Sequence, residues 1–116
     1  MQDCIFCKIA AGEIPSAIVY ENEHVIAFKD INPAAPVHVL IVPKDHIANI
    51  LDLHASGKAA AIMEYVVEAA DKIAEQAGLK DRGFRLINNC GEEGGQTVQH
   101  LHFHLIGGKK LDEKLV

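Results

Sequence analysis

Near its C-terminus the chain reads Gly94-Gly95-Gln96-Thr97-Val98-Gln99-His100-Leu101-His102-Phe103-His104-Leu105-Ile106. From His100 onwards, histidines alternate with large apolar residues. A period of two is the period of a β-strand, so the pattern predicts a strand with three histidines on one face and buried apolar residues on the other. Histidines on one face lie roughly 7 Å apart at a rise of ~3.3 Å per residue. That spacing is too wide for the three imidazoles to bind one metal ion unaided.

The segment before this strand is rich in glycine. Residues 94–97 present backbone N–H groups with little side-chain obstruction, together with a hydroxyl and an amide. Such a loop can hold phosphate oxygens. A phosphate-binding loop that leads into a row of imidazoles favours phosphoryl or nucleotidyl transfer with histidine as the nucleophile. A metal-chelating tract and a plain solvent-facing strand are the alternatives.

Composition restricts the class of protein. The chain has 116 residues, of which 49% are hydrophobic and 23% charged, with a net charge of -5. These values predict a single globular domain over residues 1–116 and argue against a nucleic-acid-binding surface. No apolar run approaches the ~20 residues of a membrane span, and the first residues do not resemble a signal peptide. We therefore expect a cytoplasmic protein with reduced cysteines.

The remaining sequence predicts an α+β fold with a five-stranded antiparallel sheet, one long helix and a short N-terminal helix. Strands are expected at 17–20, 25–30, 37–42 and 83–89, beside the histidine strand. The long helix is expected at 59–77 from its three- and four-residue apolar spacing, with Gly78 as its C′ cap. A short helix is expected to end near Gly12, and residues 109–116 form a charged tail.

Two smaller features remain open from the residues alone. Cys4 and Cys7 form a Cys-x-x-Cys pair that suits a redox couple, half of a zinc site or two buried thiols. His38 shares a predicted strand face with Leu40 and Val42. It is either a core histidine bonded to the backbone or a helper to the histidine row, and the presence of that row favours a helper.

The segment from His100 to Ile106 resembles the histidine-triad (HIT) signature, His-φ-His-φ-His-φ-φ with φ apolar. The preceding Gly-Gly-Gln-Thr-Val is similar to the phosphate loop of that family, and the resemblance extends over nearly the whole chain. It is closest to the Hint branch, whose members are nucleoside phosphoramidases. The resemblance implies a HIT-like fold, a hydrolase acting on purine nucleoside 5′-phosphoramidates, a homodimer and no organic cofactor.

The resemblance also implies roles for individual residues. His102 is the nucleophile that attacks the α-phosphorus and is transiently nucleotidylated. Asp30 binds the ribose hydroxyls, although from the residues alone it could equally be a turn residue before Asn32-Pro33. The implied catalytic set comprises His102, His104, His38, His100 and Thr97. The implied nucleotide-binding set adds Phe28, Ile31 and Ile18 around the base, and Asn89, Gly95, Gln96 and Thr97 around the phosphate.

Relatives with an N-terminal Cys-x-x-Cys suggest a Cys2His2 zinc site formed by Cys4, Cys7, His46 and His100. With four protein ligands such a zinc would be structural. One departure is the absence of tryptophan from the C-terminal segment, which leaves the preferred amine open. Three other interpretations remain: a dinucleoside polyphosphate hydrolase of the Fhit type, a non-catalytic nucleotide-binding or scaffolding module, and a zinc-storage protein.

Overall fold

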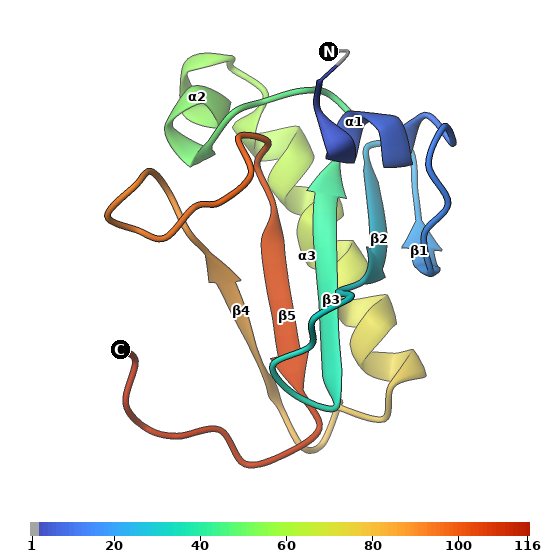
Figure 1. Ribbon diagram of the computed structural model, residues 1–116. Coiled ribbons are helices and arrows are strands. Elements are labelled where there is room, and N and C mark those ends of the chain that lie inside the picture. Colours follow the sequence, from blue (N-terminus) through green and yellow to red (C-terminus); the bar gives the residue numbers. More distant parts are fainter. Residues whose placement is uncertain (1–2) are drawn as a thin grey trace.

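The structure is a computed structural model that describes residues 3–116 (Figure 1). Five antiparallel strands form a sheet in the order β1-β2-β3-β5-β4, which places the histidine strand β5 between β3 and β4. The strands are β1 (Ile18–Glu21), β2 (Val25–Lys29), β3 (Val37–Pro43), β4 (Phe84–Asn88) and β5 (Phe103–Gly107). The helices are α1 (Ile5–Ala10), α2 (Ile50–Ala55) and α3 (Ala59–Gln76). The predicted α+β class and its five antiparallel strands are confirmed.

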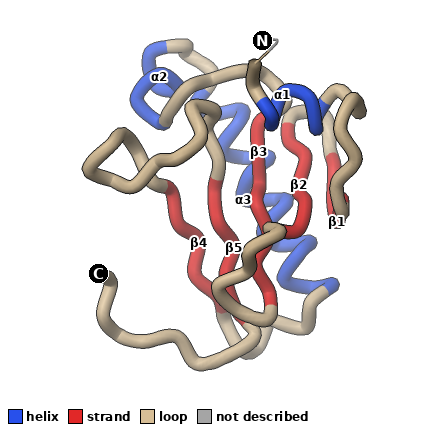
Figure 2. The backbone as a smooth tube through the Cα atoms, in the orientation of Figure 1, coloured by secondary structure: helices blue, strands red, loops and turns tan. Residues whose placement is uncertain are grey.

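The long helix α3 covers one face of the sheet (Figures 1 and 2). Its apolar side chains recur every three or four residues, so one stripe is buried while the acidic residues face solvent. The stripe packs on strand residues that include Ala27, Val39, Ile41 and Leu105. After the last turn, Gly78 has a φ of 71°, the left-handed conformation expected of a C′ residue.

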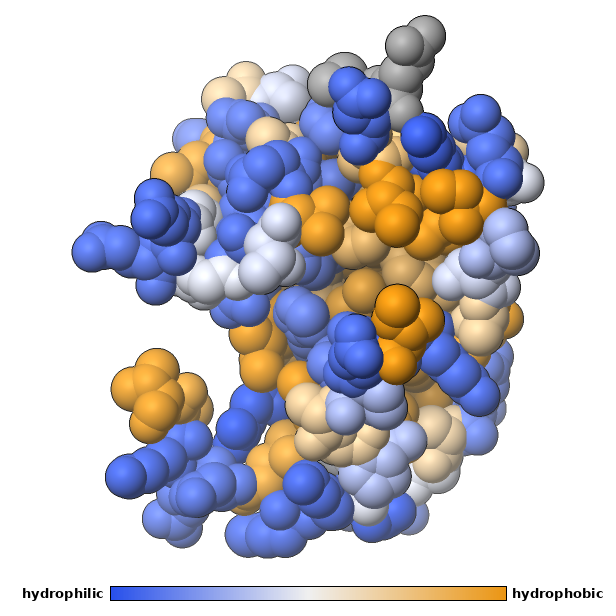
Figure 3. All heavy atoms as spheres, in the orientation of Figure 1, coloured by the Kyte–Doolittle hydropathy of each residue, from blue (hydrophilic) through white to orange (hydrophobic). Residues whose placement is uncertain are grey.

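The opposite face of the sheet is covered at one end by α1 (Figure 2). Cys4 caps this helix, because its sulfur accepts a hydrogen bond from the Cys7 N–H at 3.3 Å. Phe6 and Ile9 face the sheet and pack in a second apolar cluster that includes Phe28 and neighbouring side chains of β2 and β3. Apolar side chains accordingly gather below α1 on this face (Figure 3).

Two details of the histidine strand were predicted wrongly. The strand begins at Phe103 rather than at His100, so that His100 and His102 lie before it; both are buried, with 0% and 5% exposed, and His104 within the strand is half-buried. Pairing with β3 ends at Ile41, which lies opposite Phe103. Before that point the chain leaves the ladder, and the Leu101 N–H donates instead to the Ile47 carbonyl at 2.6 Å.

The short helix α2 was not predicted. Its first turn is capped by Asn49, whose side-chain oxygen accepts hydrogen bonds from the N–H groups of Leu51 and Asp52, both at 3.0 Å. Six residues are too few to show a helical period, so the cap was the available signal. None of the helices in residues 3–116 is long and apolar enough to cross a membrane.

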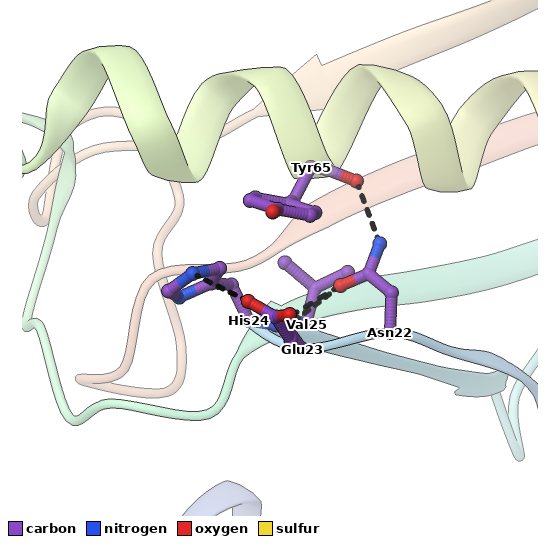
Figure 4. A network of polar contacts seen from close by, with 5 residues as sticks. All are labelled: Asn22, Glu23, His24, Val25 and Tyr65. Carbon is purple, nitrogen blue, oxygen red and sulfur yellow. Dashed lines mark hydrogen bonds and ion pairs between the residues drawn. The ribbon is translucent and has the colours of Figure 1, made fainter.

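The turn between β1 and β2 is fixed against α3 (Figure 4). The Asn22 side-chain oxygen accepts from the N–H groups of His24 and Val25 at 3.0 Å, and its amide donates to the Tyr65 carbonyl at 3.3 Å. The His24 imidazole lies on the Tyr65 ring, with centroids 4.5 Å apart. Val25 pairs with Pro43, the last residue of β3. The turn contacts therefore anchor the end of the sheet that adjoins the histidine-bearing segments.

Candidate functional site

The predicted catalytic histidines come together on the sheet face opposite α3. His38 from β3 and His104 from β5 have ring centroids 5.2 Å apart, and His102 lies 5.2 Å from His104 on the other side. His100 continues the row toward His46, 5.0 Å away. The structure therefore joins the row to a histidine from β3 and a histidine from the following loop, as the sequence predicted for His38.

The tautomer of His102 follows from one contact. Its Nδ1 lies 2.7 Å from the carbonyl oxygen of His100. A carbonyl oxygen can only accept, so Nδ1 carries the proton and donates it. The other ring nitrogen, Nε2, is then left with a free lone pair in the neutral imidazole. This is the arrangement that a histidine nucleophile requires.

His38 is hydrogen-bonded to His104 and lies at ion-pair distance from Asp30. The Ala34 backbone N–H donates to His38 Nδ1 at 2.9 Å, so Nδ1 of His38 holds no proton. In the neutral ring the proton is on Nε2, which lies 2.9 Å from His104 Nδ1 and 3.3 Å from Asp30 Oδ2. His38 can thus donate to His104, which places the proton of His104 on its own Nε2.

Burial and neighbouring charge favour a neutral His104. Burial is the largest cause that lowers the pKa of His104, and the adjacent His102 and His38 lower it further. The Asp30 carboxylate opposes these effects in part. The ring is therefore neutral near pH 7, as donation from His38 to its Nδ1 requires.

The glycine-rich loop lies beside the start of β5 (Figure 1). The Gln96 side chain is buried and fully engaged, because its oxygen accepts from Gly91 N–H at 2.9 Å and its amide donates to the carbonyls of Ala48 and Val98 at 2.7 and 2.9 Å. Gln96 therefore shapes the loop with its side chain, and also with its backbone, because its N–H donates to the Gly91 carbonyl at 3.0 Å. Gly95 takes a left-handed φ of 82°, which glycine adopts without strain.

The other predicted phosphate residues border this loop. Thr97 is exposed, and Asn89 is half-buried directly after β4. In the sheet register His104 lies opposite Ile87, so Asn89 is two residues further along the same face of β4 toward the loop. By this register Asn89 lies on the face of the sheet that carries His104, whereas Thr97 lies within the loop itself.

The predicted base-pocket residues differ in exposure. Phe28 is buried, Ile18 is 49% exposed on the edge strand, and Ile31 is 90% exposed in the loop after β2. Sequence reasoning missed Phe6, whose ring lies 5.6 Å from Phe28 and 5.1 Å from His102. It also missed Ile9, which shares the cluster with Phe6. Their spacing of three residues places them on one face of α1, but a helix of six residues is too short for that spacing to identify the face from the sequence.

A second group of side chains lies next to the histidine row. The ligand atoms of Cys4, Cys7, His46 and His100 all lie within 4.8 Å of one another. Cys4 Sγ is 3.2 Å from His100 Nδ1, and Cys7 Sγ is 3.3 Å from His46 Nδ1 and 3.5 Å from His100 Nδ1. Tetrahedral zinc with bonds of about 2.3 Å to sulfur and 2.0–2.1 Å to nitrogen separates such atoms by about 3.6 Å. The residues therefore fit a zinc ion.

The chemistry of this group also suits a cation. His100 Nε2 donates to the Pro43 carbonyl at 2.8 Å, which leaves Nδ1 deprotonated and directed at the sulfurs. Burial is the main cause that raises the pKa of the Cys7 thiol, and the neighbouring Cys4 raises it further. Burial likewise lowers the pKa of His100 despite the Pro43 hydrogen bond. A bound cation would stabilise the Cys7 thiolate that this environment otherwise disfavours.

Asp30, His38 and His104 also lie within 4.8 Å of one another, but they do not suit a metal ion. Binding through His38 Nε2 would require that nitrogen to lose its proton and Nδ1 to carry one. Nδ1 already accepts from the Ala34 N–H, so two donors would then face each other. This group is instead a hydrogen-bond relay.

The sequence was compared with known families and structures. Residues 11–111 match the family model described as the HIT domain. The chain belongs to the HIT family. This confirms the family inferred from the histidine signature, whereas the roles of individual residues stay predictions.

Relatives of this HIT protein match it over nearly their full length. The purine nucleoside phosphoramidase of Escherichia coli is 45% identical over 98% of this chain and 94% of its own. A HIT family hydrolase from Clostridium thermocellum is 53% identical, with a TM-score of 0.94 over 100% of this chain and 99% of its own. A histidine triad nucleotide-binding protein from Candida albicans is 30% identical, with a TM-score of 0.80 over 98% and 87%.

Proposed function

We propose that the protein is a hydrolase that cleaves the P–N bond of purine nucleoside 5′-phosphoramidates through a nucleotidyl-His102 intermediate. The observation that carries this proposal is the hydrogen bond from His102 Nδ1 to the His100 carbonyl, which leaves Nε2 free to attack. The name of the Escherichia coli relative supports the phosphoramidate as substrate. The name of the Candida albicans relative supports a nucleotide as ligand.

The reaction has two displacements at the α-phosphorus. His102 Nε2 forms a bond to phosphorus while the P–N bond breaks, and the amine leaves with a proton donated from the site. Water then attacks the phosphorus, the N–P bond to His102 breaks, and the nucleoside monophosphate is released. The neutral His104, with its proton on Nε2, is positioned to donate to the phosphate or to the departing amine.

Substrate binding is divided between the two sides of the histidine row. The apolar cluster of Phe28, Phe6 and Ile9, with the exposed Ile31 and Ile18 at its edge, forms the wall for the base. Asp30 accepts from the ribose hydroxyls, since its side chain retains 19% exposure beside His38. Thr97 and Asn89 supply hydroxyl and amide donors to the phosphate, while the N–H groups of Gly95 and Gln96 donate to the carbonyls of Glu92 and Gly91 and so shape the loop.

We also propose that Cys4, Cys7, His46 and His100 hold a structural zinc ion. Zinc would link α1 and the loop after β3 to the first histidine of the row. All four positions would be filled by protein groups, so the metal would take no part in the displacement. The family resemblance further suggests a homodimer. The exposed Phe84 and Leu86 on the edge strand β4 support this, because an edge strand with exposed apolar residues favours pairing with a second copy.

The test uses adenosine 5′-phosphoramidate and follows AMP release. The protein should release AMP, His102→Ala should not, and His54→Ala should match the original protein because His54 is an exposed histidine on α2. With a substrate that is chiral at phosphorus, two inversions give net retention of configuration. Inversion would contradict the covalent intermediate. Absence of release, with dinucleoside polyphosphates cleaved instead, would contradict the substrate.

A further inference from the structure

One proton of His38 lies between two acceptors. Its Nε2 is hydrogen-bonded to His104 Nδ1 at 2.9 Å and lies 3.3 Å from Asp30 Oδ2, close enough for the carboxylate charge to attract the same proton. The ring cannot turn to favour either, because Nδ1 is held by the Ala34 N–H and the side chain is only 8% exposed. The proton is therefore donated to His104 while the Asp30 carboxylate attracts it, so a change in the charge or solvation of Asp30 alters the hydrogen bond to His104.

Asp30 is oriented for this contact by the turn that follows it. Its Oδ1 accepts from the Asn32 backbone N–H at 2.8 Å, which directs Oδ2 toward His38. This is also the turn role that the sequence allowed for Asp30. A carboxylate is a stronger acceptor than a neutral imidazole. Without a ligand, Asp30 thus weakens the donation from His38 to His104.

Ribose hydroxyls would change this balance. Each carboxylate has about four acceptor positions, and two hydroxyl donors use lone pairs that otherwise attract the His38 proton. The His38 proton is then directed to His104 Nδ1. With Nδ1 accepting, the neutral His104 keeps its own proton on Nε2, ready for the phosphate or the departing amine.

We infer that Asp30 couples ribose recognition to catalysis, acting through His38 on the tautomer of His104. The inference rests on the proposed function and on ribose binding by Asp30. It assigns Asp30 a positioning role in addition to its binding role, and it makes the chain selective for nucleotides with an intact 2′,3′-diol. Selection would occur in the chemical step as well as in binding.

The kinetic test compares adenosine 5′-phosphoramidate with its 2′,3′-dideoxy analogue. Proton donation by a positioned group contributes about 10²–10⁴-fold, so its partial loss should lower kcat for the dideoxy substrate by about tenfold or more. In Asp30→Asn the charge is absent, and the ratio of the two kcat values should approach one. Asp52→Asn, at an exposed carboxylate on α2, should keep the original ratio. A difference confined to KM would overturn the inference.

A second measurement does not depend on turnover. The ¹⁵N shifts of the His104 ring report which nitrogen carries the proton. AMP should raise the fraction protonated at Nε2, and 2′,3′-dideoxy-AMP should not do so even when it saturates the site. If AMP shifts the tautomer but no phosphoramidate is cleaved, the proposed function fails and the coupling stands. If cleavage occurs and both nucleotides leave the tautomer unchanged, the coupling alone fails.

Discussion

Replacing Gly94 by alanine tests whether the glycine-rich loop acts in catalysis. A Cβ at this position would lie 2.4 Å from the Cys90 carbonyl oxygen and 3.0 Å from the Cys90 nitrogen. Contacts below 3.0 Å essentially do not occur, and ordinary contact begins at 3.4 Å. Moving the oxygen contact from 2.4 Å to between 3.0 and 3.4 Å requires the loop to open by about 0.6–1.0 Å. The obstacle is backbone, so no side-chain rotation relieves it.

A misplacement of about 1 Å in a positioning element can reduce the rate by about 10²-fold. We therefore expect Gly94→Ala to lower kcat/KM for adenosine 5′-phosphoramidate by about 10²-fold. Gly94 is exposed, but the loop also contains the buried Gln96 side chain, so the variant should lose some stability and its activity is measured well below its own Tm.

The matched control is Gly57→Ala. Gly57 lies in the turn after α2, and an added Cβ there would meet nothing within 4 Å. Its φ of 77° nevertheless strains an alanine by about 1–2 kcal/mol. It should melt lower and retain full activity. Activity of Gly94→Ala within threefold of the original, or an equal loss in Gly57→Ala, would refute the reasoning.

Three further predictions concern the metal, pH and the base pocket. A chelator should lower Tm by about 15 °C in differential scanning fluorimetry, because zinc at about 1,000 times its Kd stabilises by about 4 kcal/mol, and Cys7→Ser should show no chelator effect. With chelator present, the free energy of unfolding measured with urea should fall as the pH is lowered through 6.5, the pKa of a histidine in the unfolded chain. Burial lowers the pKa of His104 and of His100, so the unfolded chain binds more protons in that range, and His104→Asn should show a shallower slope. Phe6→Leu should raise KM by about two- to tenfold, because the aromatic contact with the base is lost. The free energy of unfolding should change by less than about 1.5 kcal/mol. An unchanged KM would contradict a role of Phe6 in the base pocket.

Most of the fold could be predicted because its elements have strong local patterns. The strands from β1 to β4 and the helix α3 were each placed within about two residues, since alternation and helical spacing reflect which side chains face the core. The start of β5 was misplaced because alternation continues through His100 and Leu101, although the backbone there bonds to Ile47. Sequence periodicity records the direction of side chains and not the partner of each N–H group.

The identities of the site residues came from the family signature, whereas their interactions did not. Nothing in the sequence indicated that Ala34 fixes the tautomer of His38, or that the Gln96 side chain is used to hold Ala48 and Val98. Both features depend on backbone groups, which every residue carries alike. Phe6 was missed for a different reason, because a six-residue helix gives too short a pattern to identify the face it buries.

The histidine segment would serve both proposed sites, because its side chains and its backbone have separate partners. The His100 ring points to the sulfurs of Cys4 and Cys7, while its carbonyl oxygen accepts the proton of His102 Nδ1. Whatever fixes His100 therefore also fixes the orientation of the nucleophile, although no metal ligand touches the reacting atoms. The Pro43 carbonyl, which accepts from His100 Nε2, completes the support from β3. A metal confined to a structural role would thus still influence catalysis, through one residue and one carbonyl group.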